Sequence, residues 1–385
     1  MATSTNGRSA RSRKLITRRG AELHFTELGF GGAPLGNLYR PMTEKEARLM
    51  LETVWASGCR YFDTAPLYGL GLSETRLNGF LRPKPRESFL ISTKVGRLLE
   101  LCKPKERSRQ DGAGAFIETP SRRERFDYSY DGVKRSLEFS LERLGLDQID
   151  IVYAHDVDAY THGSRQAADA RIKEFMNGGY RALDELRSAG AIKAIGAGVN
   201  EWEVAEALTR AGDFDVFLLA GRYTLLEQEA LTSFLPLCAQ KGIGVVVGGP
   251  FNSGILATGV KADAHYNYGP APEEVKERVR RIQQVCKSFR VKLPEAALRF
   301  PLGHQAVVSV IAGAQRASEA KRNAVMMSAK IPAALWRALK SEKLMRVQNH
   351  TNCLLDLAFD LLRCTKDMGI ILAERAHARE ASRHA

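Results

Sequence analysis

The feature that most constrains the fold of this 385-residue chain is a regular alternation of short apolar runs with amphipathic helical patterns. The runs are rich in β-branched residues and apolar at nearly every position. This is expected of parallel strands that are covered by helices on one face and by a packed interior on the other. Eight β-then-α units favour a closed α/β barrel, the (β/α)8 or TIM barrel. We predict its strands at residues 28–34, 60–63, 88–93, 148–154, 191–196, 214–219, 243–247 and 306–311.

The alternative is an open, doubly wound sheet. Such sheets bind dinucleotides through a G-x-G-x-x-G sequence between a strand and the following helix. No strand here is followed by that sequence at a helix start, and Gly69-Leu70-Gly71 supplies only a G-x-G. The closed barrel is therefore the preferred prediction.

Helix signals fill the spaces between the strands. Thr43 is a predicted N-cap with Glu46 at the capping-box position, and Ser73 is the predicted hydroxyl cap of a helix that ends at Leu81. Further helices are predicted at residues 131–144, 179–189, 201–211, 227–240, 272–290, 294–301 and 318–328, with one more after Pro332.

The predicted barrel occupies residues 21–344. Residues 1–20 are predicted to be a basic, flexible tail, because no acid precedes Glu22; the alternative for residues 1–19 is an organelle transit peptide. Residues 97–129 form an over-long, charged connection, and connections of this length are usually either lids or disordered segments. Residues 345–385 are predicted to be a helical C-terminal extension, because residues 354–362 are apolar and compatible with a helix.

Composition argues against several classes of protein. No apolar run approaches the roughly 18 residues of a membrane span. Six scattered cysteines without C-x-x-C spacing indicate reduced thiols in a cytoplasmic protein. Much of the net charge of +13 lies in the tail and in residues 103–125, without interleaved aromatic residues, which argues against nucleic-acid binding. We expect a monomer or homodimer that acts on a small molecule, away from membranes.

Four ionisable residues stand at or just after the ends of predicted strands: Asp63, Tyr68, Lys94 and His155. If the strands are parallel neighbours, these side chains meet at one mouth of the barrel. An ammonium between a carboxylate and a phenol would favour the phenolate, and an imidazole could bind or protonate a substrate oxygen. Each residue alone is more simply a structural one, but together they suit carbonyl/alcohol interconversion, with a hydride exchanged with a cofactor. One histidine beside Asp156 is a thin metal signal, so we predict no metal site.

Three motifs resemble the aldo-keto reductase superfamily: D-T-A-P-L-Y-G at residues 63–69, S-T-K-V-G-R at 92–97 and Y-A-H-D at 153–156. The resemblance runs from about Leu28 to about Leu344. Residues 31–39, 126–132 and 248–254 are similar to the D-threo-aldose 1-dehydrogenase branch, which includes L-fucose and pyridoxal dehydrogenase-like enzymes. The resemblance implies a catalytic tetrad of Asp63, Tyr68, Lys94 and His155, with Tyr68 as acid/base and a nicotinamide across the barrel mouth.

The resemblance also implies a set of cofactor contacts. Asn200 would bind the carboxamide, a glycine loop would approach the pyrophosphate, and a segment after the last strand would close on the adenosine. These contacts are Gly32, Asp63, Asn200, Gly249, Phe251, Asn252, Ser253, Gly254, Gly313, Glu319 and Asn323.

The sequence departs from the family pattern at three positions. Ala220 stands where many relatives carry a glutamine, and Gly248 where many carry an aromatic residue that stacks on the nicotinamide. Glu319 stands where NADP-preferring relatives carry an arginine. A carboxylate repels a 2′-phosphate but accepts hydrogen bonds from a free ribose hydroxyl. We therefore expect NAD, with NADP as the alternative because Arg316 and Lys321 lie close by.

The expected activity is oxidation of the anomeric hydroxyl of an aldose, such as L-fucose or another D-threo-type aldose, to its lactone. The alternatives are a pyridoxal dehydrogenase and an NADPH-dependent reductase of small aldehydes. A hypothesis of another class is a cofactor-sensing regulatory subunit, like the β-subunits of potassium channels. The intact tetrad favours an enzyme.

Overall fold

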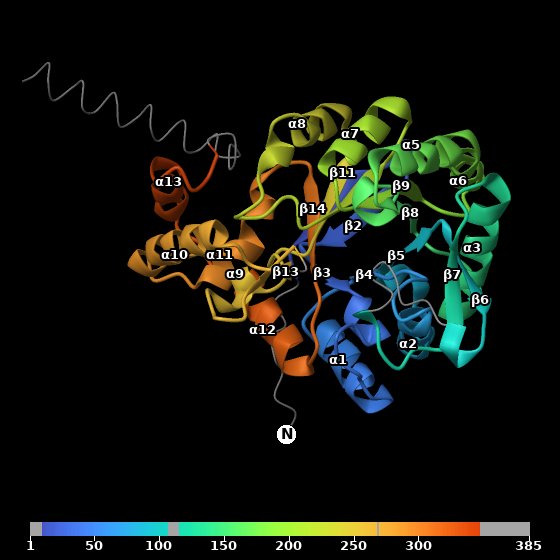
Figure 1. The fold of residues 1–385 in the computed structure, drawn as a ribbon, viewed down its shortest axis with the longest axis horizontal. Coiled ribbons are helices and arrows are strands. Elements are labelled where there is room, and N and C mark those ends of the chain that lie inside the picture. The colour runs from blue at the N-terminus through green and yellow to red at the C-terminus, as the bar shows by residue number, and fades with distance from the viewer. Residues whose placement is uncertain (1–9, 107–114, 268, 347–385) are drawn as a thin grey trace, which may run out of the picture.

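Eight parallel strands close into a barrel in the computed structural model, which describes residues 10–106, 115–267 and 269–346 (Figure 1). Neighbouring strands follow each other in chain order, and the last strand pairs with the first. This confirms the predicted (β/α)8 barrel and excludes the open sheet. The strands are β3 (Leu28–Gly31), β4 (Tyr61–Asp63), β5 (Leu90–Val95), β8 (Ile151–His155), β9 (Ala194–Val199), β10 (Val216–Ala220), β11 (Gly244–Gly248) and β14 (Val307–Ala312).

Several strands begin two or three residues later than predicted. The reason is visible at Asp150 and Asp215, which precede β8 and β10. Their carboxylates accept the backbone N–H groups of Ile91 and Ile195 on a neighbouring strand, each at 2.9 Å. At each point the carboxylate replaces one backbone acceptor, while the N–H groups of Asp150 and Asp215 still donate to the carbonyls of Ile91 and Ile195. The regular ladders start beyond these points.

Helices surround the barrel (Figure 1). The predicted capping box is confirmed: Thr43 Oγ1 accepts the Glu46 N–H at 3.2 Å, and the Glu46 carboxylate accepts the Thr43 N–H at 2.8 Å. The outer helices are α1 (Glu44–Ala56), α2 (Leu72–Leu81), α3 (Tyr130–Leu144), α6 (Tyr180–Ser188), α7 (Trp202–Ala211), α8 (Phe234–Lys241), α10 (Glu273–Ser288), α11 (Leu293–Arg299), α12 (Ala317–Met327) and α13 (Ala333–Ser341).

Three details of the helix prediction are wrong. Ser73 does not cap α2, because its hydroxyl turns inward and donates to the Gly32 carbonyl at 2.8 Å. The predicted helix at residues 227–240 is a 3-10 turn over Glu229–Leu231 followed by α8, whose first turn accommodates Pro236 because proline has no N–H to donate. The short helices α4 (Ala159–His162), α5 (Arg165–Glu174) and α9 (Ile255–Thr258) were not predicted.

The N-terminal end of the barrel is closed by an antiparallel hairpin of β1 (Ser12–Ile16) and β2 (Glu22–Thr26). Its side chains Leu15, Leu23 and Phe25 are buried among the residues that fill the barrel. The prediction of a flexible tail over residues 1–20 is therefore wrong for residues 12–16. Arg13, which we read as part of a solvated tail, donates to the carbonyls of Leu302 and Val307 at 2.7 and 2.8 Å.

The long connection after β5 contains a second hairpin, β6 (Arg97–Leu101) and β7 (Arg122–Phe126), which lies at the edge of the barrel beside α3 (Figure 1). An isolated antiparallel β-bridge pairs Phe116 of this connection with Leu38, which lies in the loop that follows β3. A third hairpin, β12 (His265–Tyr266) and β13 (Gly269–Pro270), follows α9. Whether the connection acts as a lid stays a prediction.

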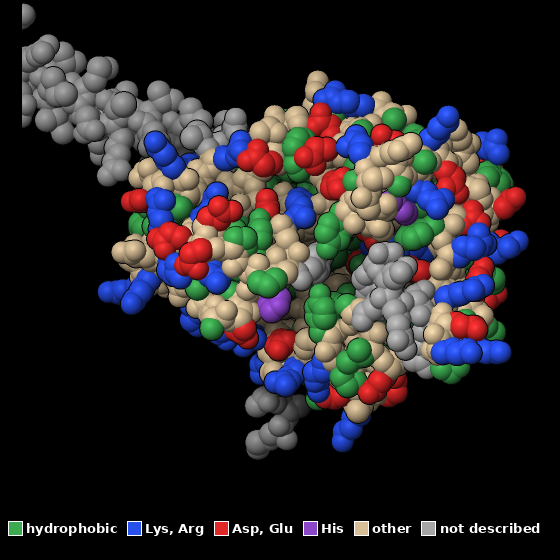
Figure 2. Space-filling view, viewed as in Figure 1, with side chains coloured by type: hydrophobic (Ala, Val, Ile, Leu, Met, Phe, Trp, Pro, Cys, Tyr) green, Lys and Arg blue, Asp and Glu red, His purple; other side chains and the backbone are tan. Residues whose placement is uncertain are grey.

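The C-terminal part of the barrel ends with α13, as predicted after Pro332, and its Trp336 and Leu339 are buried. The predicted helical extension at residues 345–385 lies almost wholly outside the described residues. No helix in the described ranges is long and apolar enough to cross a membrane. Figure 2 shows basic and acidic side chains interspersed over the visible face of the barrel.

Candidate active site

The strand pairing brings the predicted catalytic residues to one end of the barrel. Asp63 is the last residue of β4, Lys94 the last but one of β5, and His155 the last of β8. Because β4, β5 and β8 are consecutive parallel neighbours, their C-terminal ends lie at the same rim. Tyr68 reaches this rim from the loop between β4 and α2.

The Lys94 ammonium is the centre of the site. Its Nζ donates to Asp63 Oδ2 at 2.7 Å, to the Thr64 carbonyl at 2.9 Å and to Tyr68 Oη at 3.1 Å. The side chains of Lys94 and Asp63 are each 1% exposed. An ammonium has three protons to donate, so this geometry fixes its position and directs one proton at the phenol.

Asp63 is in turn held from the other side. Ser92 Oγ donates to Asp63 Oδ1 at 2.7 Å and lies 3.0 Å from the Tyr61 hydroxyl. We did not predict a role for Ser92. It stands two residues before Lys94, and alternate residues of a strand face the same side. That spacing was the available signal.

The structure corrects the expected ionisation of Tyr68. The ammonium is close enough to favour a phenolate, but burial raises the pKa of Tyr68 well above its ordinary value. The carboxylates of Asp63 and Asp156 act in the same direction, and Arg97 opposes them. In this state of the protein Tyr68 is a neutral phenol, ready to donate a proton.

His155 is buried beside the tyrosine, with the two ring centroids 6.0 Å apart. Burial lowers its pKa well below the ordinary value, and the cations Arg97 and Lys94 add to this effect. The imidazole is therefore neutral at neutral pH. Its Nδ1 is buried without a hydrogen-bond partner among the described residues, and its Nε2 lies 3.2 Å from Asp156 Oδ2.

The predicted carboxamide ligand, Asn200, follows β9 at the same rim. Its Nδ2 donates to Asp156 Oδ1 at 3.2 Å and to Asp158 Oδ2 at 3.3 Å. The next two strand ends, Ala220 and Gly248, are paired in register and present little or no side chain. A Cβ added at Gly248 would meet its nearest atom, in Leu218, only at 3.4 Å. This part of the rim therefore carries no bulky side chain of its own from these two strand ends.

The predicted pyrophosphate loop follows β11. Its backbone is left-handed at Gly249, Asn252, Ser253 and Gly254, with φ of 59°, 44°, 55° and 100°. The N–H groups of Asn252 and Gly254 donate within the loop, to the carbonyls of Gly249 and Phe251 at 3.1 and 3.0 Å. The loop is thus a series of tight turns, a backbone conformation in which further N–H groups can approach an anion. The Asn252 side chain shapes this loop from within, because its Nδ2 donates to the Gly221 carbonyl at 3.0 Å. Phe251, also among the predicted contacts, is partly buried against the main core.

The predicted adenosine segment connects β14 to α12. Asn323 Nδ2 donates to the Gly313 carbonyl at 3.3 Å, and the Glu319 carboxylate accepts the Gln315 N–H at 2.8 Å. Gly32 lies behind the site, where a Cβ would come within 2.7 Å of the Asp63 carbonyl. The left-handed loop, the bare strand ends and Asn200 together fit a nicotinamide dinucleotide.

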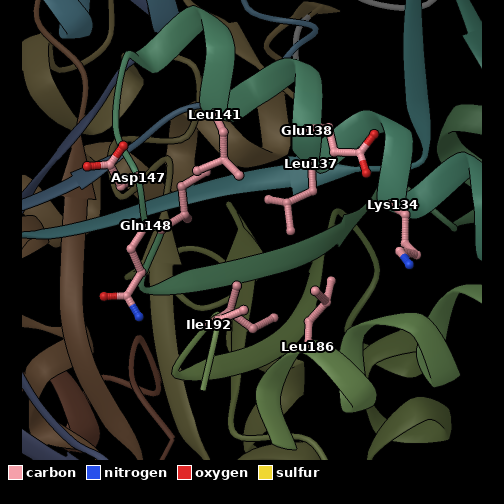
Figure 3. Close-up of a pocket in the computed structure, with 10 residues that line it drawn as sticks. Lys134, Leu137, Glu138, Leu141, Asp147, Gln148, Leu186 and Ile192 are labelled. Carbon is pink, nitrogen blue, oxygen red and sulfur yellow. The ribbon is translucent and has the colours of Figure 1, made fainter. Parts of the chain in front are cut away.

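Other features of the described residues offer no competing chemistry. No cluster of three His, Cys, Asp or Glu side chains is arranged there to hold a metal ion. A cavity of about 220 Å³ lies between α3 and α6 (Figure 3) and contains no tetrad residue. Its lining is mostly apolar, with Leu137, Leu141, Leu186 and Ile192 facing one another.

Known proteins resemble the chain in both sequence and fold. The sequence is 42% identical over 345 residues to pyridoxal 4-dehydrogenase of Microbacterium luteolum, covering 87% of this chain and 98% of that protein. It is 42% identical over 329 residues to D-threo-aldose 1-dehydrogenase of a Pseudomonas species, covering 84% and 96%. The structure matches aldo-keto reductase AKR11C1 from Bacillus halodurans with a TM-score of 0.67 and 25% identity, covering 89% of this chain and 99% of that one.

The Aldo/keto reductase family matches residues 27–342, a range that contains the whole barrel and every residue of the tetrad. Family members exchange hydride with NAD(P)(H), which agrees with a rim where a buried phenol lies against an ammonium group. The chain therefore belongs to the aldo/keto reductase family and is an oxidoreductase.

Proposed function

We propose that this enzyme oxidises the anomeric hydroxyl of an aldose, such as L-fucose or another D-threo-type sugar, to the lactone. Two findings support the proposal: the 42% identity to a D-threo-aldose 1-dehydrogenase and the strand-end geometry at the rim. The observation that carries it is the position of the Lys94 ammonium, 3.1 Å from Tyr68 Oη and 2.7 Å from Asp63.

The residues at the rim supply proton transfer and orientation. A bound nicotinamide supplies the acceptor for the hydride that leaves the anomeric carbon. The phenolate form of Tyr68, which alkaline pH and the Lys94 ammonium 3.1 Å away favour, takes the proton of the anomeric hydroxyl as the carbonyl of the lactone forms. The neutral imidazole of His155 hydrogen-bonds the substrate oxygen and orients it toward Tyr68.

Pyridoxal is the second candidate substrate. The identity to pyridoxal 4-dehydrogenase is also 42%, and Phe116 supplies an apolar wall suited to an aromatic ring. The Phe116 side chain is 8% exposed, and its ring centroid lies 6.0 Å from that of Tyr68. Pyridoxal carries an aldehyde beside a hydroxymethyl group and can close to a cyclic hemiacetal, whose carbon has the oxidation state of an anomeric carbon. The same proton transfer therefore serves both substrates.

We propose NAD rather than NADP as the cofactor. The Glu319 carboxylate is held at the start of α12 by the Gln315 N–H. A negative charge fixed there opposes a 2′-phosphate and leaves an oxygen to accept a ribose hydroxyl.

The test is to supply purified enzyme with NAD⁺ or NADP⁺ and a panel of aldoses and pyridoxal, and to follow formation of the reduced nicotinamide. Tyr68→Phe is expected to lose turnover by about 10²–10⁴-fold while it still binds the nucleotide. If Tyr68→Phe turns over at the wild-type rate, the assignment is wrong. Tight nucleotide binding without turnover on any substrate would instead favour the regulatory subunit.

A further inference from the structure

The carboxylate of Asp156 contacts both the substrate side and the cofactor side of the rim. Its Oδ2 lies 3.2 Å from Nε2 of His155, and its Oδ1 accepts a hydrogen bond from Nδ2 of Asn200 at 3.2 Å. His155 is the proposed ligand of the substrate oxygen, and Asn200 is the proposed ligand of the nicotinamide carboxamide. One small group therefore touches two side chains with different tasks.

A buried arginine fixes this carboxylate. Arg97 donates to Asp156 Oδ2 at 2.7 Å, and it also binds Glu124 of β7. The Arg97 side chain is 1% exposed, and its guanidinium lies over the Phe126 ring, 4.5 Å from the centroid. Because Arg97, Glu124 and Phe126 all belong to the β6–β7 hairpin, the insertion delivers this cation to the rim.

The backbone around Asp156 is also constrained. Asp156 has a left-handed φ of 52°, a conformation that is unfavourable for most side chains and that aspartate tolerates better than others. Its N–H donates to the Gly198 carbonyl at 2.8 Å, and Tyr128 Oη donates to the His155 carbonyl at 2.5 Å. Tyr128 can pack here because residue 96 is glycine, where a Cβ would lie 2.1 Å from the ring.

We propose that Asp156 is a positioning residue that orients His155 and Asn200 together, and that Arg97 of the β6–β7 hairpin holds Asp156 in the required place. The inference deepens the proposed function and rests on it. It makes the hairpin part of the active-site framework. It also couples the geometry for the substrate to the geometry for the nucleotide through one carboxylate.

A comparable ion pair elsewhere in the barrel shows what a purely structural arrangement looks like. Asp215 and Arg187 are 2.7 Å apart, with the Asp215 side chain fully buried where that of Asp156 is 14% exposed. The Asp215 carboxylate accepts the backbone N–H groups of Ile195 and Arg18 at the N-terminal end of the barrel, far from the rim. Asp215→Asn is therefore the matched control for Asp156→Asn.

The experiment measures nucleotide affinity by calorimetry with NAD⁺ and turnover with the best substrate, for Asp156→Asn, His155→Ala, Asn200→Ala and the control. We expect His155→Ala to lower kcat and Asn200→Ala to raise the nucleotide Kd. Asp156→Asn should do both, by about tenfold each. Asp215→Asn should change neither, although it lowers the melting temperature.

Two double variants decide whether Asp156 acts through its neighbours. Asp156→Asn added to Asn200→Ala should raise the Kd no further, and added to His155→Ala should lower kcat no further. Fully additive effects, or an Asp156→Asn variant that behaves like the control, would overturn the inference. If His155→Ala and Asn200→Ala themselves change nothing, the assigned site and not the positioning role has failed.

Discussion

Removal of the Lys94 ammonium tests the physical basis of the site. Lys94→Met leaves the Asp63 carboxylate buried, with Ser92 as its remaining side-chain donor. Breaking a buried ion pair from one side typically costs about 3–5 kcal/mol of folding stability, because the remaining charge has no compensation. Removing both charges, in Lys94→Met/Asp63→Asn, should recover most of that loss.

The stability loss should depend on pH. Burial already raises the pKa of Asp63 above its ordinary value, and loss of the ammonium raises it further. A carboxyl with a raised pKa in the folded state destabilises that state as pH rises from the unfolded toward the folded pKa, by about 1.4 kcal/mol per pH unit. Lys94→Met should therefore be closer to wild type in urea unfolding at about pH 5.5 than at about pH 8.5.

Turnover should not follow stability. Neither variant has a cation against Tyr68, so both should lose about 10²–10⁴-fold in kcat, including the double variant whose fold is restored. Two results would refute the reasoning. Recovery of turnover together with stability in the double variant would make Lys94 a structural residue only. Wild-type stability of Lys94→Met at alkaline pH would show that the substitution leaves no unpaired charge buried at Asp63.

Three further predictions address the proton, the substrate and the nucleotide. Because burial and two nearby carboxylates raise the pKa of Tyr68, the rate of oxidation should rise about tenfold per pH unit into the alkaline range, while reduction stays flat; a plateau of oxidation near neutrality would contradict this. Phe116→Ala should raise the KM of the substrate about tenfold without changing the nucleotide Kd. Leu101→Ala, at an 85% exposed residue of the same insertion, should change neither. A KM of Phe116→Ala equal to that of the wild type would show that Phe116 does not contact the substrate. Glu319→Arg should shift the ratio of kcat/KM for NADP⁺ over NAD⁺ upward by about tenfold or more, and an unchanged ratio would show that this residue does not face the ribose.

The barrel and the meeting of the tetrad could be predicted because both follow from periodicity. Parallel strands place their C-terminal residues at one rim, so Asp63, Lys94 and His155 could be brought together without any side-chain coordinates. The strand starts near Asp150 and Asp215 were predicted less accurately, because a side-chain carboxylate replaces one backbone acceptor there.

The errors arose where burial or a long-range contact decides the outcome. The basic composition around Arg13 suggested a solvated tail, whereas carbonyl groups nearly three hundred residues away bind its guanidinium. The ionisation of Tyr68 was judged from its neighbour Lys94 alone, and the desolvation that opposes the ammonium depends on the closed packing of the rim. The sequence presents Asp156 only as part of a thin metal signal, because its contact with Arg97 exists only once the β6–β7 hairpin has folded.

The β1–β2 hairpin, which closes the N-terminal end of the barrel, limits how far the enzyme can be shortened. Phe25 contacts the ring of Tyr61 edge-on, at a centroid distance of 4.9 Å. The Tyr61 hydroxyl is hydrogen-bonded to Ser92 Oγ, which donates to the Asp63 carboxylate. Because protein interiors are close-packed and transmit strain, a displacement of Phe25 would shift Tyr61, Ser92 and Asp63 in turn. A fragment that began at β3 would keep the whole tetrad, but it would lose the β1–β2 side chains that pack beneath it in the barrel interior.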